Sequence, residues 1–493
     1  MLSVSEGDPA ARNLPSGPVF VNFKPTARTI ALTAYWAGLL VLFVALRLNL
    51  SDTQLNIFDL IPVKVAEAMS ARGALDPNWR FGDLPWFWNR DQYNFYFYNI
   101  VAHGVLKAGA WFGASALPAL RLANVIFQLF ALAFSIAALR RLGVGTFGLA
   151  LAGTLLAVAP GMVQDAGMAR PESLIYLVVA LQLWILTLPL TEVRRAFLFG
   201  ALIGIGSAIK VTYALTASLL IAMWAMSRDA RLRRWLLGAV ALGAGAALGF
   251  AAAAPYAVIH PVMFMNGLAA LAETYNSGLP PHSLPQFDLL HQGLWVAKYF
   301  LQLYGPVLPA ALAAPFLLTG EPRKLSVGFV VLWILVSVYF IGKPVFFERN
   351  FSHALIPLLL AATLAVAALR RPDLRFGAAA VLALWMGYWS VQIAAAVNFP
   401  GGAERFEADN ALVPSLRLSF DDSFNKKVPE RCETIALTDH NDPWTANFLA
   451  LLEAQGFRPI ALYRGRFSAL VTSTLHTYLD SDVHYLRCPE SKR

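Results

Sequence analysis

The sequence carries little charge for its length. Only 14% of its 493 residues are Asp, Glu, Lys or Arg, whereas 57% are hydrophobic. A typical soluble domain has roughly 25% charged and about 45–50% apolar residues. Because lipid cannot hydrate a charged side chain, segments that cross a membrane exclude charges. The deficit excludes an ordinary water-soluble protein and indicates a protein that crosses a membrane several times.

Cysteine is also scarce, and no solenoid-type repeat or low-complexity segment is present. The two cysteines, Cys432 and Cys488, lie in the polar C-terminal part. Without a CxxC pair or a Cys/His cluster, we expect no zinc site. The net charge of +9 could indicate a nucleic-acid partner. The arginines lie in short loops between apolar runs, however, so we interpret them as signals of membrane topology and expect no nucleic-acid partner.

Apolar runs long enough to cross a bilayer, about 20 residues each, recur along the chain. They lie at 29–48, 117–138, 146–163, 173–190, 235–257, 303–319, 325–342, 351–369 and 376–397. No small-x-small cleavage signal follows the first run, which predicts an uncleaved anchor. Residues 196–226 can form only about 46 Å of helix, which is less than two crossings of a ~30 Å core. We therefore expect two short helices with an apex near Lys210, and about eleven spans in total.

Basic loops predict the orientation of these spans. If the tail 1–28 is cytoplasmic, the other loops on that side are rich in arginine, as the positive-inside rule requires. They contain Arg140, Arg141, Arg194, Arg195, Arg228, Arg231, Arg233, Arg234, Arg323, Lys324, Arg370, Arg371 and Arg375. The C-terminus is then on the outer side of a bacterial inner membrane. The transmembrane domain covers 29–397, with large outer loops at 49–116 and 258–302.

The polar segment 398–493 has the pattern of a small periplasmic α/β domain. Strands are predicted at 433–439, 459–464 and 484–488, and an amphipathic helix at 443–455 that Gly456 ends. An oxidising compartment permits a disulfide between Cys432 and Cys488. Closing so long a loop stabilises by about 4 kcal/mol in the chain-entropy model. The alternative is two unpaired cysteines in the core.

Ionisable residues from distant segments gather near the predicted outer face. They are Asp59, Glu67, Asp76, Arg80, Asp91, Asp165, Arg170, Glu172, Lys210, His260, Glu348, Arg349 and His353. A pore would instead leave polar groups distributed through the spans. The clustering predicts a binding or catalytic site at the outer interface.

The first outer loop is predicted to begin with a surface helix after Asp59. Ile61, Val65 and Met69 share one helical face, which is typical of a helix lying in the membrane interface. Asp59 immediately precedes this helix and has two interpretations. It is either an N-cap or a general base that deprotonates an acceptor hydroxyl.

Two further segments have both a structural and a functional interpretation. Eight of the fourteen residues in 85–98 are aromatic, so they form either an interfacial belt or the wall of a sugar or lipid groove. Asp165, Arg170 and Glu172 lie within eight residues of one another. Helix capping alone explains an acid at the start of a helix, but three charges in a short membrane turn favour a site.

Three residues further along are candidates for binding an anion. Lys210 either extends its amine to the membrane surface or meets a phosphate. Arg349 can hold a phosphate through its planar guanidinium, or it pairs with Glu348. His353 follows in the next span and is weak evidence when taken alone.

In order along 29–397, several motifs together resemble the GT-C superfamily of membrane glycosyltransferases. They are IFDLIPVKVAEAMSARGALDP, YNFYFYNIVAHGV, SALPALRLANVIF, ARPESLIYLVVAL, GIGSAIKVTYAL and FFERNFSHALIPLLLAAT. Within it, the chain resembles the protein O-mannosyltransferase-like and lipid A aminoarabinose transferase-like members. The resemblance implies an inverting transfer of sugar, a hexose or a pentose, from a polyprenyl-phosphate carrier. The acceptor would be a glycan, lipid or protein of the cell envelope.

The resemblance also implies roles for individual residues. The family's acidic residue in the first outer loop matches Asp59, which makes Asp59 the catalytic base. The family often has Asp-Glu there, whereas Leu60 follows Asp59 here. Glu172 matches a position where Asp is commoner, and Lys210 and Arg349 match basic positions assigned to the carrier phosphate. Asp91, Asp165, Arg170 and His353 are predicted to contact substrate as well.

Two other functions are compatible with a chain of this composition. A transporter or flippase for lipid-linked sugars would place ionisable residues deep in several spans and contain internal repeats. A non-catalytic envelope assembly protein would keep the fold but tolerate the loss of Asp59. No dense carboxylate motif demands a divalent ion, so no metal ligand is assigned, and a divalent metal remains an open alternative.

Overall fold

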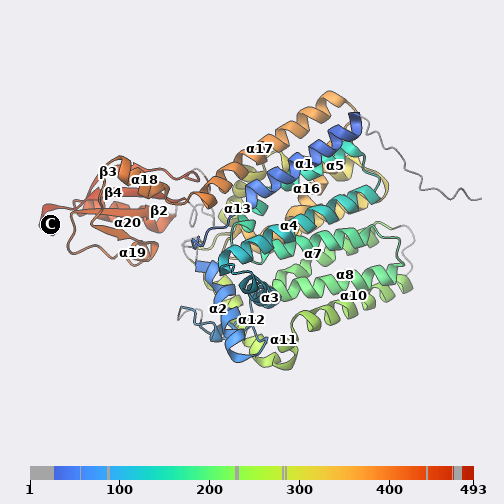
Figure 1. The fold of residues 1–493 in the computed structure, drawn as a ribbon, viewed down its shortest axis with the longest axis horizontal. Helices are drawn as coiled ribbons and strands as arrows, with labels where there is room; N and C mark the ends of the chain where they lie inside the picture. The colour runs from blue at the N-terminus through green and yellow to red at the C-terminus, as the bar shows by residue number, and fades with distance from the viewer. Residues whose placement is uncertain are drawn as a thin grey trace, which may run out of the picture.

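The computed structural model describes residues 27–55, 57–85, 89–227, 232–279, 282–283, 286–439, 442–468, 470 and 480–493. The predictions for the tail 1–26, for the aromatic residues 86–88 and for the loop arginines Arg228 and Arg231 therefore lie outside the described residues. Figure 1 shows a helical bundle, from one end of which a small domain projects.

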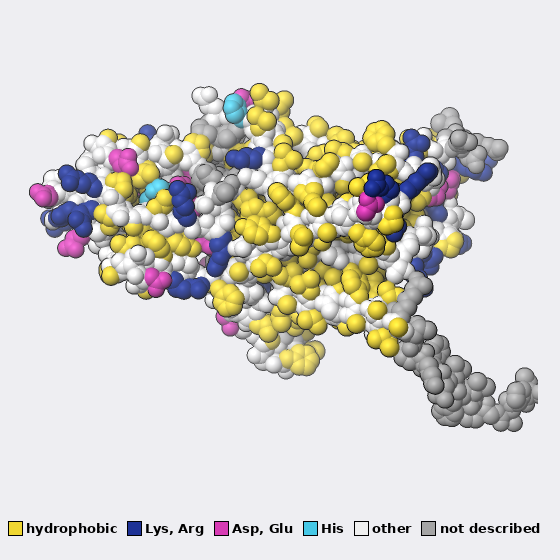
Figure 2. Space-filling view, turned by 90° about the horizontal axis from the view of Figure 1, so that it is seen from above, with side chains coloured by type: hydrophobic (Ala, Val, Ile, Leu, Met, Phe, Trp, Pro, Cys, Tyr) yellow, Lys and Arg dark blue, Asp and Glu magenta, His cyan; other side chains and the backbone are white. Residues whose placement is uncertain are grey.

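The bundle contains long apolar helices, and the chain is a multi-pass membrane protein. Among the described residues, six helical segments are long and apolar enough to cross a membrane. They lie in α1 (Ala27–Arg47), α4 (Ala116–Arg141), α10 (Leu232–Ala253), α15 (Gly320–Ile341), η4 with α16 (Glu348–Phe351 and Ser352–Ala367), and α17 (Pro372–Asn398). Figure 2 shows many hydrophobic side chains on the face of the bundle that is in view.

Two bent helix pairs add to this set. The bend is 50° between α5 (Thr146–Ala157) and α6 (Pro160–Ala166), and 90° between α13 (Leu289–Tyr304) and α14 (Val307–Leu317). Counting each pair as one span gives up to eight candidates in the described chain, so the predicted count of eleven is not confirmed. One reason for the lower count is that α7 (Glu172–Leu186) has only 15 residues, fewer than a helix needs to cross the membrane.

The chain breaks at Lys210, where the sequence predicts an apex. The helix α8 (Glu192–Ile209) ends there, because Lys210 has an extended backbone, and η3 (Val211–Thr216) and α9 (Ala217–Ala225) follow. The helices α8 and α10 pack closely through glycines on both. A Cβ on Gly204 would lie 2.1 Å from the carbonyl oxygen of Ala246. This contact leaves no room for any side chain.

Substituting alanine at this contact is expected to destabilise the bundle. The Cβ of Gly249→Ala would lie 2.1 Å from the carbonyl oxygen of Ala201, so the two helices must separate, at a typical overpacking cost of about 1–3 kcal/mol. Gly243→Ala on the same helix is the matched control, since no described atom outside its own helix backbone lies within 4 Å of its Cβ. Thermal unfolding of the purified proteins should rank Gly249→Ala well below Gly243→Ala; equal midpoints would contradict the contact.

Short helices cover the end of the bundle that faces the small domain. They are η1 (Ile57–Asp59), α2 (Leu60–Arg72), η2 (Trp79–Phe81), α3 (Tyr96–Trp111), α11 (Pro255–Ile259) and α12 (Pro261–Ser277). The predicted apolar face of α2 is buried inside the protein through Ile61, Val65 and Met69, so the prediction that this face lies in the membrane interface is wrong. In the aromatic segment, the described rings of Tyr93, Phe95, Tyr96 and Tyr98 are buried in the protein. An interfacial belt is therefore the wrong interpretation for these four rings.

The C-terminal domain is a four-stranded sheet covered by helices. Its elements are α18 (Gly402–Asp409), β1 (Leu416–Leu418), α19 (Phe420–Phe424), β2 (Thr434–Asp439), α20 (Pro443–Ala454), β3 (Arg458–Tyr463), β4 (Asp482–Arg487) and η5 (Glu490–Lys492). The strand order is β1-β2-β4-β3, with β1 parallel to β2 and the other pairs antiparallel. Leu437 and Leu486 face α20 and share a core with Phe448.

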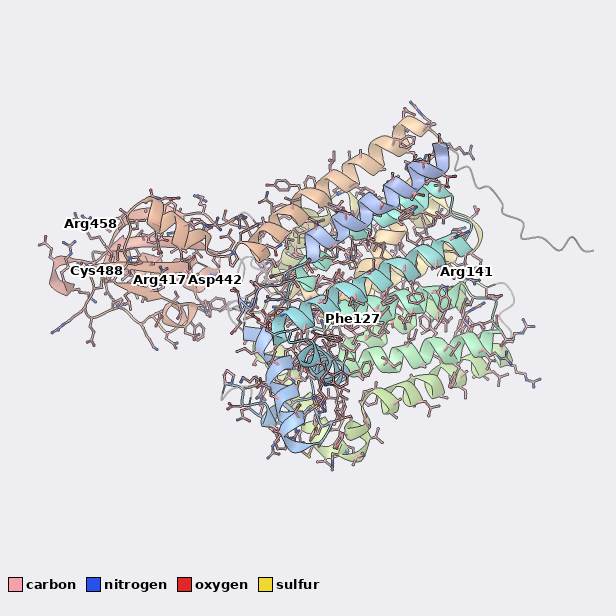
Figure 3. All side chains as sticks on the ribbon, viewed as in Figure 1. Phe127, Arg141, Arg417, Asp442, Arg458 and Cys488 are labelled. Atoms are coloured by element: carbon pink, nitrogen blue, oxygen red, sulfur yellow. A yellow bond between two sulfur atoms is a disulfide. The ribbon has the colours of Figure 1, made fainter. Side chains whose placement is uncertain are left out.

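A disulfide and two apolar side chains fix this domain. The sulfur atoms of Cys432 and Cys488 are bonded at 2.00 Å and close a loop across 56 residues; Figure 3 labels Cys488 in the domain. Between β3 and β4, the side chains of Phe467 and Leu470 are buried and belong to the apolar core of the membrane domain. The sheet domain is thus attached to the bundle by this contact as well as by the end of α17.

Candidate active site at the covered end of the bundle

The charged residues predicted to form a site converge where several helix ends meet. The turn after α6 carries Arg170, α7 begins at Glu172, α8 ends at Lys210, and η4 carries Glu348 and Arg349. Each of these side chains is at least nine-tenths buried. Because each comes from the interruption of a helix, irregular backbone here brings polar groups into an otherwise apolar bundle.

Asp59 is completely buried and links three segments of the chain. One carboxylate oxygen accepts the N–H of Ala169 at 2.9 Å, and the other accepts the N–H of Leu55 at 3.0 Å. That second oxygen also lies 3.2 Å from the guanidinium of Arg121. Asp59 occupies the N-cap position of α2, but its side chain makes no capping hydrogen bond there, so capping does not explain its carboxylate.

Arg121 is a residue of the site that sequence reasoning missed. It lies in the first turns of α4, is fully buried, and donates to the carbonyl oxygens of Ser51 and Thr53 at 2.6 and 2.8 Å. Together with Asp59 it anchors the segment 51–55 above the bundle. An arginine near the start of an apolar span was the available signal, because such a position is costly without a partner.

Two arginines lie close to the ring of Phe58, the residue before Asp59. The guanidinium carbon of Arg349 lies 4.3 Å from the centroid of this ring, and that of Arg170 lies 5.5 Å from it. None of the three guanidinium nitrogens of Arg170 has a hydrogen-bond partner among the described residues, and one nitrogen of Arg349 also lacks one. Buried donors without acceptors are costly, so this arrangement favours an anionic ligand.

Glu172 and Lys210 form the one close ion pair between predicted members of this cluster, among the described residues. The Lys210 ammonium lies 3.6 Å from a Glu172 oxygen and donates to the carbonyl oxygen of Arg349 at 2.9 Å. Lys210 is therefore turned into the cluster rather than toward the membrane surface. Neither oxygen of Glu172 has a hydrogen-bond partner in the described chain, so its carboxylate retains free lone pairs.

Asp165 and Glu348 line a small cavity next to these cations. The hydroxyl of Tyr176 donates to Asp165 at 2.6 Å, and the amide of Gln164 donates to Glu348 at 3.0 Å. The cavity, which Arg349 also lines, measures about 20 Å³, enough for one water molecule. A sugar ring does not fit this cavity in the state described.

The last predicted residue of the cluster, His353, lies in the first turn of α16. It is fully buried, neither ring nitrogen has a hydrogen-bond partner among the described residues, and its ring centroid is 6.1 Å from that of Tyr213. The two ring nitrogens of His353 can therefore donate or accept a hydrogen bond with a ligand bound beside Lys210.

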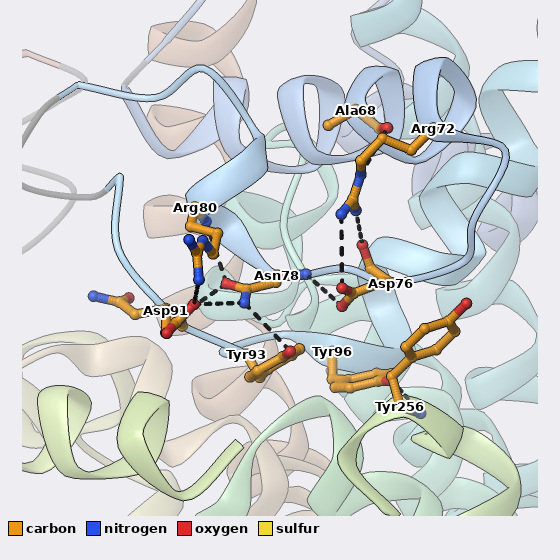
Figure 4. Close-up of polar contacts among 10 residues, drawn as sticks. Ala68, Arg72, Asp76, Asn78, Arg80, Asp91, Tyr93, Tyr96 and Tyr256 are labelled. Carbon is orange, nitrogen blue, oxygen red and sulfur yellow. Dashed lines mark hydrogen bonds and ion pairs between the residues drawn. The ribbon is translucent and has the colours of Figure 1, made fainter. Parts of the chain in front are cut away.

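Asp91 belongs to a different network, within the first outer loop (Figure 4). It accepts hydrogen bonds from Asn78 at 2.8 Å and from Arg80 at 3.2 Å. Asn78 also donates to the hydroxyl of Tyr93 at 3.3 Å. Burial, and then the carboxylate of Asp76, raise the pKa of Tyr93 to about 12, so its hydroxyl stays protonated. Among the described residues, the hydrogen-bond partners of Asp91 belong to this loop and include no member of the central cluster.

Comparison by sequence identifies no relative: no family model matches the chain, and no curated protein matches it. Solved structures do match. The crystal structure of ArnT from Cupriavidus metallidurans in the apo state aligns over 93% of this chain and 98% of its own, with 15% identity and a TM-score of 0.52. The structure of ArnT bound to undecaprenyl phosphate aligns with the same coverage, 16% identity and a TM-score of 0.54. The chain has the ArnT fold.

The likeness to ArnT extends over both the bundle and the C-terminal part, because it covers almost the whole of each chain. It confirms the GT-C type of fold that the sequence predicts. A cryo-EM structure of the arabinofuranosyltransferase AftD from Mycobacteria matches 93% of this chain but 41% of its own, with 15% identity and a TM-score of 0.45. This weaker likeness adds nothing to the assignment of the fold.

Proposed function

We propose that this chain is a glycosyltransferase that moves a sugar from a polyprenyl-phosphate carrier to an acceptor of the cell envelope. The observation that carries the proposal is the pair of buried arginines that contact the ring of Phe58. Arg170 has no hydrogen-bond acceptor among the described residues, and one guanidinium nitrogen of Arg349 also lacks one there. An ionised phosphate oxygen is a strong acceptor for guanidinium donors. The fold supports the proposal, since an ArnT structure is bound to undecaprenyl phosphate.

In the proposed reaction, Arg170, Arg349 and Lys210 stabilise the phosphate as it leaves. The acceptor oxygen forms a bond to the anomeric carbon on the face opposite to the phosphate. The bond from that carbon to the phosphate oxygen breaks, and its electron pair stays with the phosphate. The configuration at the anomeric carbon inverts. Stabilisation of the developing charge by positioned cations is commonly the largest catalytic contribution.

Asp59 is the proposed base that takes the proton of the acceptor hydroxyl. It directly follows Phe58, the residue whose ring the two arginines contact. Both of its oxygens accept hydrogen bonds in the described state and the side chain is fully buried. The acceptor can therefore reach it only if the segment 51–55 moves aside, which releases the N–H of Leu55. Glu172, with unoccupied lone pairs, is the alternative base.

The disulfide supports an outer location for the C-terminal domain, because disulfides persist in oxidising compartments. The bundle end that carries the charged cluster is the end that faces this domain. We therefore place the reaction at the outer face of a bacterial inner membrane. The N-terminus is then cytoplasmic and the domain 398–493 periplasmic. His353 and Asp165 are proposed to contact substrate once the site opens, and Asp91 to organise the loop above it.

Binding of the carrier tests this proposal directly. Undecaprenyl phosphate should raise the thermal unfolding midpoint of the purified protein, because a ligand that binds only the folded state stabilises it. Undecaprenol, which has the same chain but no phosphate, is the control and should produce a much smaller shift. Equal shifts from both compounds would show that the arginines do not recognise the phosphate, and would contradict the proposal.

A further inference from the structure

A second lipid-facing feature lies on the opposite half of the bundle, away from the charged cluster. The helices α1 and α4 border a groove of about 450 Å³. Trp36, Leu39 and Leu40 form one wall, and Leu129 and Ala133 belong to the other. Among the described residues that line the groove, Arg140 at the end of α4 is the one that carries a charge.

We propose that this groove binds an anionic phospholipid, with one acyl chain between α1 and α4 and the headgroup at Arg140. The inference does not depend on the proposed enzymatic function. It assigns a structural lipid to the membrane leaflet on the side opposite to the C-terminal domain. Figure 3 places Arg141, the neighbour of Arg140, at the end of α4 farthest from that domain.

The dimensions of the groove fit one leaflet. From Leu129 to Arg140 the helix rises about 16 Å, at 1.5 Å per residue. Half of a ~30 Å hydrocarbon core is about 15 Å. The lining thus runs from near the middle of the membrane to the level of the headgroups, which is the path of an acyl chain in one leaflet.

The chemistry of the groove also fits a lipid better than water. Leu40 and Leu129 are 46% and 37% exposed on its rim, and apolar walls of this kind gain nothing from hydration. Arg140 is exposed and makes no ion pair with any described residue. Helix dipole and topology preferences explain a cation at this position, but they do not explain a groove that ends at it. Charge complementarity therefore selects a lipid with an anionic headgroup.

Native mass spectrometry of the full-length purified protein tests the assignment. Phosphatidylglycerol and phosphatidylcholine with identical acyl chains are titrated separately, so that only the headgroup differs. Wild type should retain phosphatidylglycerol preferentially. Arg140→Gln should weaken that binding about fivefold, the effect of one basic residue near an anionic headgroup.

Two further variants separate the groove from general surface charge. Arg234→Gln, an exposed arginine on α10, is the control and should retain wild-type binding. Ala133→Phe with Ala137→Phe fills the groove and should remove the tightly bound lipid while Arg140 is present. The proposal is overturned if Arg234→Gln weakens binding as much as Arg140→Gln, if both lipids bind equally, or if the groove-filling variant retains the lipid. A dimeric protein in place of lipid-bound monomers would also overturn it, because a second copy would then occupy the groove.

Discussion

Asp59→Asn is expected to lower sugar transfer by about 10²- to 10⁴-fold, the usual contribution of a general base, while carrier binding stays intact. Asparagine keeps the shape of the side chain but cannot take a proton from an acceptor hydroxyl. The measurement is transfer of labelled sugar from membrane-extracted lipid carrier at equal membrane expression. Glu67→Gln is the matched control, since Glu67 is an exposed acid in the same loop.

The buried partner of Asp59 makes a second variant necessary. Asparagine leaves the guanidinium of Arg121 without its counter-charge, and breaking a buried pair in this way commonly costs about 3–5 kcal/mol. Adding Arg121→Met removes the isolated charge, so the double variant should unfold closer to wild type and still fail to transfer. Recovery of transfer in the double variant would assign Asp59 a structural role and direct attention to Glu172.

Arg170→Met is expected to weaken binding of the carrier phosphate by about 10- to 100-fold, the range for hydrogen bonds to a charged group. The same change should leave thermal stability unchanged or raise it. Arg170 is a buried cation without a hydrogen-bond partner in the described chain, and an apolar side chain of similar length removes the cost of burying it. A gain in stability with a loss of binding is the signature of a residue kept for its ligand.

Two comparisons decide between this account and a purely structural arginine. Arg170→Lys keeps the charge but not the planar pair of donors, so it should recover only part of the binding. Arg194→Met, at an exposed arginine on α8, should leave binding unchanged. If Arg170→Met instead destabilises the protein by several kcal/mol and binds the carrier normally, Arg170 serves the fold and the proposed phosphate site is wrong.

Local patterns in the sequence predicted the elements that depend on nearest neighbours. The spacing of Ile61, Val65 and Met69 identified the buried face of α2. The length of 196–226 predicted the break at Lys210, because two full crossings do not fit. In the C-terminal domain, β2 and α20 begin and end within a residue of their predicted limits. The spacing of apolar residues and the capping residues at helix ends are sufficient to predict elements of this kind.

Features that depend on tertiary packing could not be read in this way. The predicted span 303–319 begins just before the 90° bend between α13 and α14, so the sequence places most of α13 in an outer loop, whereas the structure makes it an apolar helix packed at an angle to α14. The three-residue strand β1 is too short for a periodic signal and exists through its parallel pairing with β2. Asp59 could be singled out, but its partner Arg121 lies 62 residues away, and no local rule joins two residues at that distance.

The site was predicted as a set of residues rather than as a geometry. The predicted membrane topology placed four charged residues at one end of the bundle, and the structure shows them close together there. They are Arg170, Glu172, Lys210 and Arg349. Asp91 came from the same reasoning but forms its hydrogen bonds in the loop network. Membrane topology predicts only the depth of a residue along the membrane normal. Two residues at the same depth can still lie far apart in the membrane plane and belong to separate hydrogen-bond networks.

The central claim is that the buried arginine cluster serves the transfer of sugar from a lipid phosphate. The most direct measurement follows a labelled sugar on its extracted lipid carrier, in vesicles that contain the purified wild-type protein and an envelope extract as acceptor. The account predicts that the label moves from the lipid to the acceptor with an inverted anomeric configuration, and that Arg170→Met prevents the movement. Label that stays on its carrier and only changes membrane leaflet would contradict the account and indicate a transporter.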